Sequence, residues 1–205
     1  MTLPNDSVLV TPGSGATVAT HLVAAKEYQV VMEADIDGHI KGSRASFTAF
    51  FPAVTNAANR EVAELFNADA SLIVRVQGIW IMPSLTAITG VQIGFDINKI
   101  SAVGTTGSTA ITPRPLDSNF TALDTDITAR YGSTAGATLN HLFWTSYFFN
   151  DETNPSSIIG LINQLPVVSD KVVEIVLRQN QGVQVKESVT ATVGLTAALM
   201  YFTVE

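Results

Sequence analysis

The chain of 205 residues contains no cysteine. This absence excludes disulfide bonds, thiol nucleophiles, zinc ribbons and iron–sulfur clusters. Lysine and arginine are also scarce, with 11 basic against 18 acidic residues and a net charge of −7. Because phosphate contacts need clustered basic side chains, this balance argues against a nucleic-acid partner.

Long apolar runs and a basic leader are missing as well. No stretch of about 20 uncharged apolar residues occurs, so we expect no transmembrane helix and no membrane partner. The opening "MTLPNDSVLVTPGSG" lacks the basic segment of a signal peptide and contains two prolines and an aspartate. We therefore expect synthesis in a cytoplasm without general secretion.

Charge is low overall, at 14% of residues against roughly 25% in typical soluble domains. Hydrophobic residues make up 46% of the chain, and the mean hydropathy is +0.28. The length suits one domain with an appendage. A surface with so little charge favours association with other chains, which hides apolar area from water.

Short apolar runs between Gly, Pro, Asn and Asp clusters predict an all-β fold. Residues 71–83 read as a strand, with a bulge at Gly78. Residues 91–100 alternate cleanly between apolar and polar side chains, as a half-buried strand does. Residues 195–205 are apolar on both faces, which indicates that the core covers one face and a neighbour covers the other.

Three further segments have less regular patterns. Residues 57–69 fit a helix or a strand ending at Asn67, and their strand neighbours favour the strand. Residues 154–165 are the best helical segment, with Asn154 as a cap and Pro155 at the first helical position. Residues 174–188 read as two strands around "QNQG", which is typical of a hairpin.

Residues 1–45 lack the alternation of the later strands, and we interpret them as an N-terminal arm preceding a domain over residues 46–205. Val30, Val31 and Met32 are its candidate apolar anchors on a partner surface. In the alternative interpretation, "EYQVVMEAD" is one more strand of the domain. The Thr-, Ser- and Pro-rich residues 104–127 predict a long loop of the kind that a partner orders.

Two acidic motifs have the residue types of a metal site. On a strand, Asp35, Asp37 and His39 would share one face, as ligands of a divalent ion must. Asp124 and Asp126 faintly resemble a calcium loop but lack its glycine and its downstream glutamate. We interpret both motifs as solvated polar turns, and we expect no metal and no cofactor.

Catalytic motifs find no support, and we expect a protein without enzymatic activity. The histidines His21, His39 and His141 lie in no recognisable motif. The aromatic run "LFWTSYFF" (142–149) predicts a packed strand, with Phe143 and Phe148 in the core. Aromatic side chains also anchor interfaces, so Trp144 and Tyr147 are the interface candidates of this strand.

A diffuse pattern over roughly residues 60–205 resembles the jelly-roll head decoration, or cement, proteins of tailed bacteriophages. The pattern consists of a Val- and Ile-rich strand, a "TG" turn, "SAVGTTG", "TPRPLD", "ITARYG", "LRQNQG" and the closing "FTVE". The resemblance implies an antiparallel β-sandwich of jelly-roll type with about eight strands. At most one short helix is expected beside them.

The resemblance further implies a non-enzymatic structural protein on the outer surface of a virion's capsid, synthesised in the host bacterial cytoplasm. Its expected partners are the major capsid protein and itself, most simply as a homotrimer. Similar jelly rolls occur in tail and fibre appendages. A receptor- or glycan-binding appendage, with Trp144 and Tyr147 facing a sugar, is therefore the alternative.

Overall fold

The computed structural model describes residues 20–23, 26–29, 44–85, 91–118, 122–150, 162–163, 167–168, 171–172, 174–189 and 194–205. Every regular element within these ranges is a β-strand, which confirms the all-β prediction. The chain divides into two compact units, residues 1–43 and 44–205. Each unit is described by itself.

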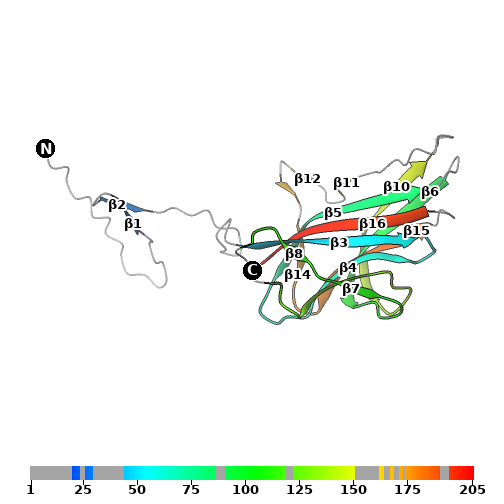
Figure 1. The fold of residues 1–205 in the computed structure, drawn as a ribbon, viewed down its shortest axis with the longest axis horizontal. Helices are drawn as coiled ribbons and strands as arrows, with labels where there is room; N and C mark the ends of the chain where they lie inside the picture. The colour runs from blue at the N-terminus through cyan, green and yellow to red at the C-terminus, as the bar shows by residue number, and fades with distance from the viewer. Residues whose placement is uncertain are drawn as a thin grey trace. The chain divides into compact units, whose positions relative to one another are not determined.

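The described part of the first unit is a small antiparallel hairpin. It consists of β1 (Thr20–Val23) and β2 (Lys26–Gln29) (Figure 1). The proposed anchors Val30, Val31 and Met32 lie outside the described residues, as do the proposed ligands Asp35, Asp37 and His39. The docking of this segment on a partner stays a prediction.

The second unit contains two six-stranded sheets that enclose one core. The first, named here the β16 sheet, has the order β11-β5-β16-β3-β8, and β14 pairs with the first residues of β5, Val74 to Val76 (Figure 1). Its strands are β3 (Ala45–Thr55), β5 (Val74–Leu85), β8 (Arg114–Pro115), β11 (Ile162–Asn163), β14 (Ile175–Leu177) and β16 (Gly194–Val204).

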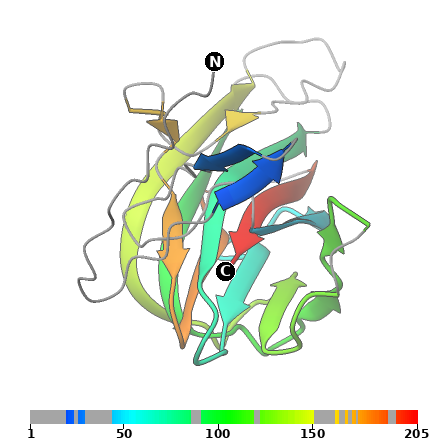
Figure 2. The same cartoon turned by 90° about the vertical axis from the view of Figure 1, so that its left-hand side faces the viewer.

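The second sheet, named here the β15 sheet, has the order β10-β6-β15-β4-β9-β7. Its edge strand β10 is the long curved yellow-green arrow of Figure 2. The strands are β4 (Glu61–Asn67), β6 (Val91–Ala102), β7 (Thr109–Ile111), β9 (Ile127–Tyr131), β10 (Thr138–Asn150) and β15 (Gln181–Val189). A separate short pair joins β12 (Val167–Val168) and β13 (Lys171–Val172).

The core lies between the sheets, where the alternating apolar residues of both meet. On β6, Ile93, Phe95 and Ile97 are fully buried, as the alternation predicted. Phe47 and Phe202 stack across β3 and β16 with ring centroids 5.7 Å apart. Such paired apolar faces explain why the sequence folds as two layers rather than as one sheet.

Several strand predictions are confirmed. The two sheets together have twelve strands against the expected number of about eight, because they include the short strands β7, β8, β11 and β14 of two or three residues each. The pairing of β5 with β16 shifts register beside Gly78, where the bulge was predicted. The segment 57–69 contains a strand that ends at Asn67, and not a helix.

The predicted hairpin over residues 174–188 is wrong. β14 pairs with β5 in one sheet, whereas β15 pairs with β4 and β6 in the other. The turn between them, with Asn180 at a φ of 57°, therefore crosses from sheet to sheet. Local turn residues predict a reversal of the chain, but they do not determine whether the strands on either side pair.

The predicted helix over residues 154–165 is wrong in its described part. Ile162 and Asn163 form β11, which pairs with Ile81 and Trp80 of β5. The edge of β5 offers unpaired backbone groups at this point, and pairing with them outweighs the weak helical spacing. The remaining residues of the segment lie outside the described ranges.

Candidate functional site

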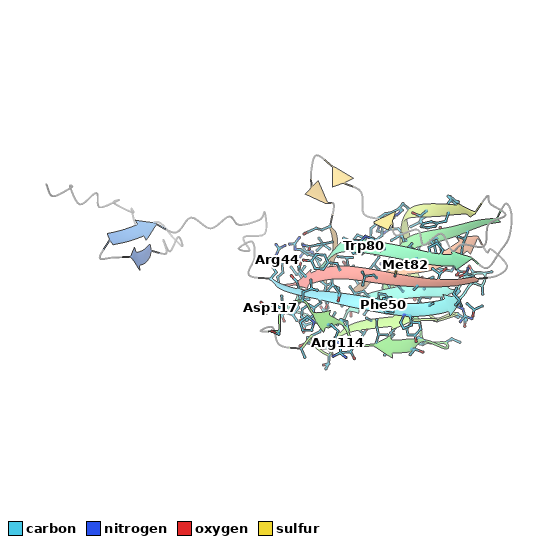
Figure 3. The ribbon with its side chains drawn as sticks, turned by 45° about the horizontal axis from the view of Figure 1, so that its top comes forward. Arg44, Phe50, Trp80, Met82, Arg114 and Asp117 are labelled. Carbon is cyan, nitrogen blue, oxygen red and sulfur yellow. The ribbon has the colours of Figure 1, made fainter. Side chains whose placement is uncertain are left out.

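The outer face of the β16 sheet carries a continuous apolar patch, named here the apolar face. Leu199 of β16 is in register with Phe50 of β3 on one side and with Trp80 of β5 on the other. Figure 3 shows Phe50, Trp80 and Met82 on the strands that flank β16. The apolar face consists of Phe50, Trp80, Met82, Leu195, Leu199 and Tyr201.

Two of the six side chains of the apolar face are exposed to solvent, and the others are half-buried. Phe50 is 58% exposed and Leu195 is 46% exposed, while Trp80, Met82 and Leu199 are half-buried. Ala198, Met200 and Phe202 face the core, which is the first of the two covers predicted for residues 195–205, and cover of the other face by a neighbour stays a prediction. A contiguous exposed apolar patch is typical of a surface that binds another protein.

Trp80 lies over the backbone of Gly78 on the same strand. A Cβ atom added at Gly78 would lie 2.3 Å from Cη2 of the Trp80 indole. Glycine is therefore required for this placement of the ring, and not for an unusual backbone angle. Tyr201 is the register partner of Gly78, so the indole and the phenol lie on adjacent strands of one face.

Charged groups gather where β3 and β5 begin and β16 ends. Arg75 Nε donates to Glu205 Oε1 at 2.5 Å, and Arg75 Nη1 lies 3.4 Å from Glu174 Oε2. Arg44, the first residue of the second unit, pairs with Glu205 as well. These charged side chains give the apolar face a polar rim at one end.

The structure separates the two aromatic candidates of β10. Trp144 is opposite Ile97 of β6, faces the sandwich interior and packs against the core. Tyr147 is opposite Gly94 on the outer face and is 50% exposed. Phe148 packs edge-on against Phe95 at 5.5 Å. Tyr147 is thus the candidate that presents its ring outward, and its interface role stays a prediction.

A second distinctive site is a group of buried carboxyl groups on the outer face of the β15 sheet. Glu61 and Glu64 of β4 are 2% and 1% exposed. Gln184 of β15, in register with Glu64, donates from Nε2 to Glu61 Oε2 at 2.8 Å. The backbone N–H of Gly104 donates to Glu64 Oε2 at 2.9 Å. We name these residues the carboxyl cluster.

The carboxyl cluster is buried because a loop crosses above it. A Cβ atom on Gly104 would lie 2.5 Å from Glu61 Oε2 and 2.6 Å from Ser133 Oγ, so only glycine fits there. Burial and, next, the adjacent Glu61 carboxylate raise the pKa of Glu64 to about 8, against the opposing effects of the Gly104 hydrogen bond and Arg130. Burial also raises the pKa of Glu61, which the Arg130 guanidinium opposes.

A pocket of about 70 Å³ adjoins the carboxyl cluster. Its walls come from the turn before β4, the crossing loops and β15, and they include Asn59, Glu61, Ser133, Gly136, Gln184 and Lys186. Ligand sites for organic molecules are several times larger. The pocket suits water molecules or one ion.

Asp124 and Asp126 form the exposed acidic turn that the sequence predicted. The backbone N–H of Asp126 donates to Asp124 Oδ1 at 2.8 Å. Asp69 lies beside them, and carboxylate oxygens of the three residues lie within 4.8 Å of one another. Asp69 Oδ1 accepts from the backbone N–H groups of Ser71 and Leu72, which lowers its pKa. Turn hydrogen bonds therefore account for this exposed group.

Sequence reasoning missed the carboxyl cluster. The signal was present in "EVAELF", where two glutamates interrupt an otherwise apolar strand. Their spacing of three residues does not fit the two-residue period of a strand. The register shift between β4 and β15 beside Glu61 brings both side chains to the outer face. Gln184 and Gly104 come from distant parts of the chain.

Comparisons with family models, with curated proteins and with solved structures give no match for this chain. None of the described residues forms a helix that is long and apolar enough to cross a membrane. The function must therefore be argued from the surfaces and sites described above.

Proposed function

We propose that this protein is a non-enzymatic structural component of a virion: a capsid decoration, or cement, protein of a phage head. It binds the major capsid protein on the outer capsid surface, as a homo-oligomer and most simply as a trimer. The observation that carries the proposal is the apolar face, whose exposed Phe50 and Leu195 need a partner.

The strand order supports a jelly roll. In a jelly roll of eight strands, the first, eighth, third and sixth form one sheet, and the second, seventh, fourth and fifth form the other. The order β3-β16-β5, with β11 and β14 at the edge, agrees with the first sheet. The order β4-β15-β6-β10 agrees with the second. On this assignment, β7, β8 and β9 belong to an insertion between the fourth and fifth strands.

The apolar face supports a protein partner rather than a small ligand. Phe50, Leu199 and Trp80 form a row across three strands, and the charged side chains gather at one end. Aromatic anchors inside a polar rim are the usual anatomy of a protein interface. None of the six residues of the apolar face lines the described pocket of about 70 Å³, and small-molecule sites are usually concave.

The carboxyl cluster is compatible with a structural role. A pair of carboxyl groups can act as the acid and the base of a catalysed reaction. Glu61 and Glu64, however, lie beneath Gly104, and the adjoining pocket measures only about 70 Å³. An organic substrate would have to displace the crossing loop to reach them. We therefore assign the cluster to the stability of the fold and not to catalysis.

The proposal is tested by binding to phage particles that lack this chain. Phe50→Asp places a charge on the most exposed residue of the apolar face and should abolish co-sedimentation with such particles. Leu142→Asp is the matched control, because Leu142 is 51% exposed on β10 of the opposite sheet. Equal binding by wild type and Phe50→Asp would contradict the assigned face. Binding to glycans and not to capsids would favour the appendage alternative.

A further inference from the structure

Arg114 of β8 extends the apolar face toward the edge of the β16 sheet. It is in register with Thr48 of β3, and Thr48 is in register with Tyr201 of β16 on its other side. Residues directly opposite each other on paired strands point to the same side of a sheet. Because Tyr201 belongs to the apolar face, the Arg114 side chain lies on that face too. Figure 3 shows Arg114 on the side of β3 that is turned away from β16.

Arg114 has an exposed apolar side chain on either side of it. Phe50, two residues after Thr48, and Leu116, two residues after Arg114, are each 58% exposed, the highest value among the large hydrophobic side chains described. Side chains two residues apart on an extended strand share a face. Phe50, Arg114 and Leu116 therefore form one exposed group, named here the Arg114 patch.

The backbone that presents Arg114 is held in place. Pro113 and Pro115 flank Arg114 in the sequence, Pro113 is buried, and Pro115 pairs with β3. Proline has a fixed φ angle, and the residue before a proline favours an extended backbone. The backbone N–H of Leu116 also donates to the carbonyl oxygen of Ser46 at 2.8 Å. A segment ordered before binding loses less conformational entropy when it joins an interface.

The Arg114 guanidinium has no acidic partner in the described part of the chain. No hydrogen bond and no ion pair within 4.0 Å joins its side chain to another described residue, whereas Arg44 and Arg75 both pair with Glu205. The chain as a whole has a net charge of −7. Arginine binds a carboxylate through two parallel hydrogen bonds, and this geometry is specific. An unpaired arginine between exposed apolar side chains thus fits an acidic group on a partner.

We propose that the Arg114 patch docks on an exposed segment of the major capsid protein in which an acidic side chain stands between two apolar ones. The carboxylate pairs with Arg114, and the apolar side chains pack on Phe50 and Leu116. This inference rests on the proposed decoration function and adds the chemistry of the partner segment. A second copy that docked by the same patch would bring two arginines together, which is unfavourable.

The test measures binding of the full chain to phage particles that lack it, at about 0.05 M and about 0.5 M NaCl. We expect Arg114→Glu to weaken binding by about tenfold or more at low salt and to reduce its salt dependence. Arg114→Lys keeps the charge without the paired donors, so its affinity should lie between the two. Arg178→Glu is the matched control, since Arg178 is exposed in the turn after β14 and its reversal changes the net charge equally. It should bind as wild type does.

A second measurement identifies the carboxylate on the particle. Coupling of the particle's carboxylates to glycinamide with a carbodiimide converts them to neutral amides. The treatment should weaken binding of the wild-type chain to the level of Arg114→Glu, and it should weaken Arg114→Glu little further. Equal further losses for both chains would show that Arg114 does not contact a carboxylate. If Arg114→Glu does not fold, Arg114→Lys takes its place in this comparison.

Three further results would overturn the inference. If Arg114→Glu binds as Arg178→Glu does while Phe50→Asp does not bind, the apolar face docks without this ion pair and the proposed function stands. If the wild-type chain does not bind the particles, the proposed function fails and the inference fails with it. If Arg114→Glu dissociates the homo-oligomer in sedimentation, the carboxylate belongs to a second copy and not to the capsid.

Discussion

The indole of Trp80 covers Gly78, two residues earlier on β5, where an added Cβ would lie 2.3 Å from Cη2. The bulge beside Gly78 and the absence of a side chain there together make room for the ring. The ring thus covers part of its own strand, while Phe50 stands exposed across β16. The shape of the apolar face therefore depends on a single glycine.

Gly78→Ala should force the Trp80 ring away from the strand. Overpacking of this kind costs about 1–3 kcal/mol of unfolding free energy. The chain has two tryptophans, so the measurement is made in a Trp144→Phe background, where the fluorescence reports Trp80 alone. We expect a red-shifted emission and a lower denaturation midpoint. Unchanged emission would mean that Trp80 does not lie over Gly78.

Glu187 of β15 predicts a pH dependence of stability. The side chain is fully buried, and its Oε2 accepts from the backbone N–H of Ala57 at 2.7 Å. Burial raises the pKa of Glu187 to about 7, while the Ala57 hydrogen bond and Arg60 oppose the shift. The folded state therefore binds this proton more tightly than the unfolded state, whose glutamate has a pKa of 4.5.

The unfolding free energy should accordingly fall as the pH rises from about 4.5 through about 7. Glu187→Gln keeps an acceptor for Ala57 and removes the titration. Relative to wild type, the variant should be more stable at pH 8 than at pH 5, by on the order of 1–3 kcal/mol. Urea unfolding in chelator at both pH values measures this difference. Parallel pH profiles would show that Glu187 titrates normally.

The N-terminal unit should be dispensable for folding. Because Arg44 pairs with Glu205, a truncation must keep Arg44, and the variant lacking residues 1–43 is the informative one. We expect it to remain soluble and cooperatively folded but to lose attachment to particles. Removing residues 1–25 tests the first part of the arm in the same assay. An insoluble 44–205 chain would show that the segment belongs to the core.

The low charge of the chain and its apolar face predict self-association. Sedimentation of the purified chain at micromolar concentration should give the mass of a trimer of the 21.8 kDa chain. Leu142→Asp should sediment as wild type does. A monomer across that concentration range would refute the oligomer.

Local sequence patterns predicted the strands in which buried and exposed side chains alternate along the chain. The alternation on β6 places Ile93, Phe95 and Ile97 in the core, and the glycine in the apolar run of β5 marks its bulge. These features depend on neighbours within a few residues. The period of two is a property of the strand itself, so it is visible without the fold.

Pairing across long distances could not be predicted in this way. β14 and β15 flank a turn yet join different sheets, because each pairs with strands far away in the chain. The carboxyl cluster depends on Gly104 approaching Glu64 from a distant loop. Trp144 and Tyr147 have similar neighbours in the sequence. Only their register with Ile97 and Gly94 of β6 shows that the Trp144 side chain faces the core and the Tyr147 side chain faces outward.

The most direct test of the proposed decoration role is to locate and count this chain on purified particles. Cryo-electron microscopy of particles with a tagged chain, combined with quantitative mass spectrometry, gives its position and its copy number relative to the major capsid protein. The account predicts density on the outer head surface in regular register with the capsomers, and a copy number of the same order as that of the capsid protein. A few copies confined to the tail or fibres, or no copies on the particle, would contradict it.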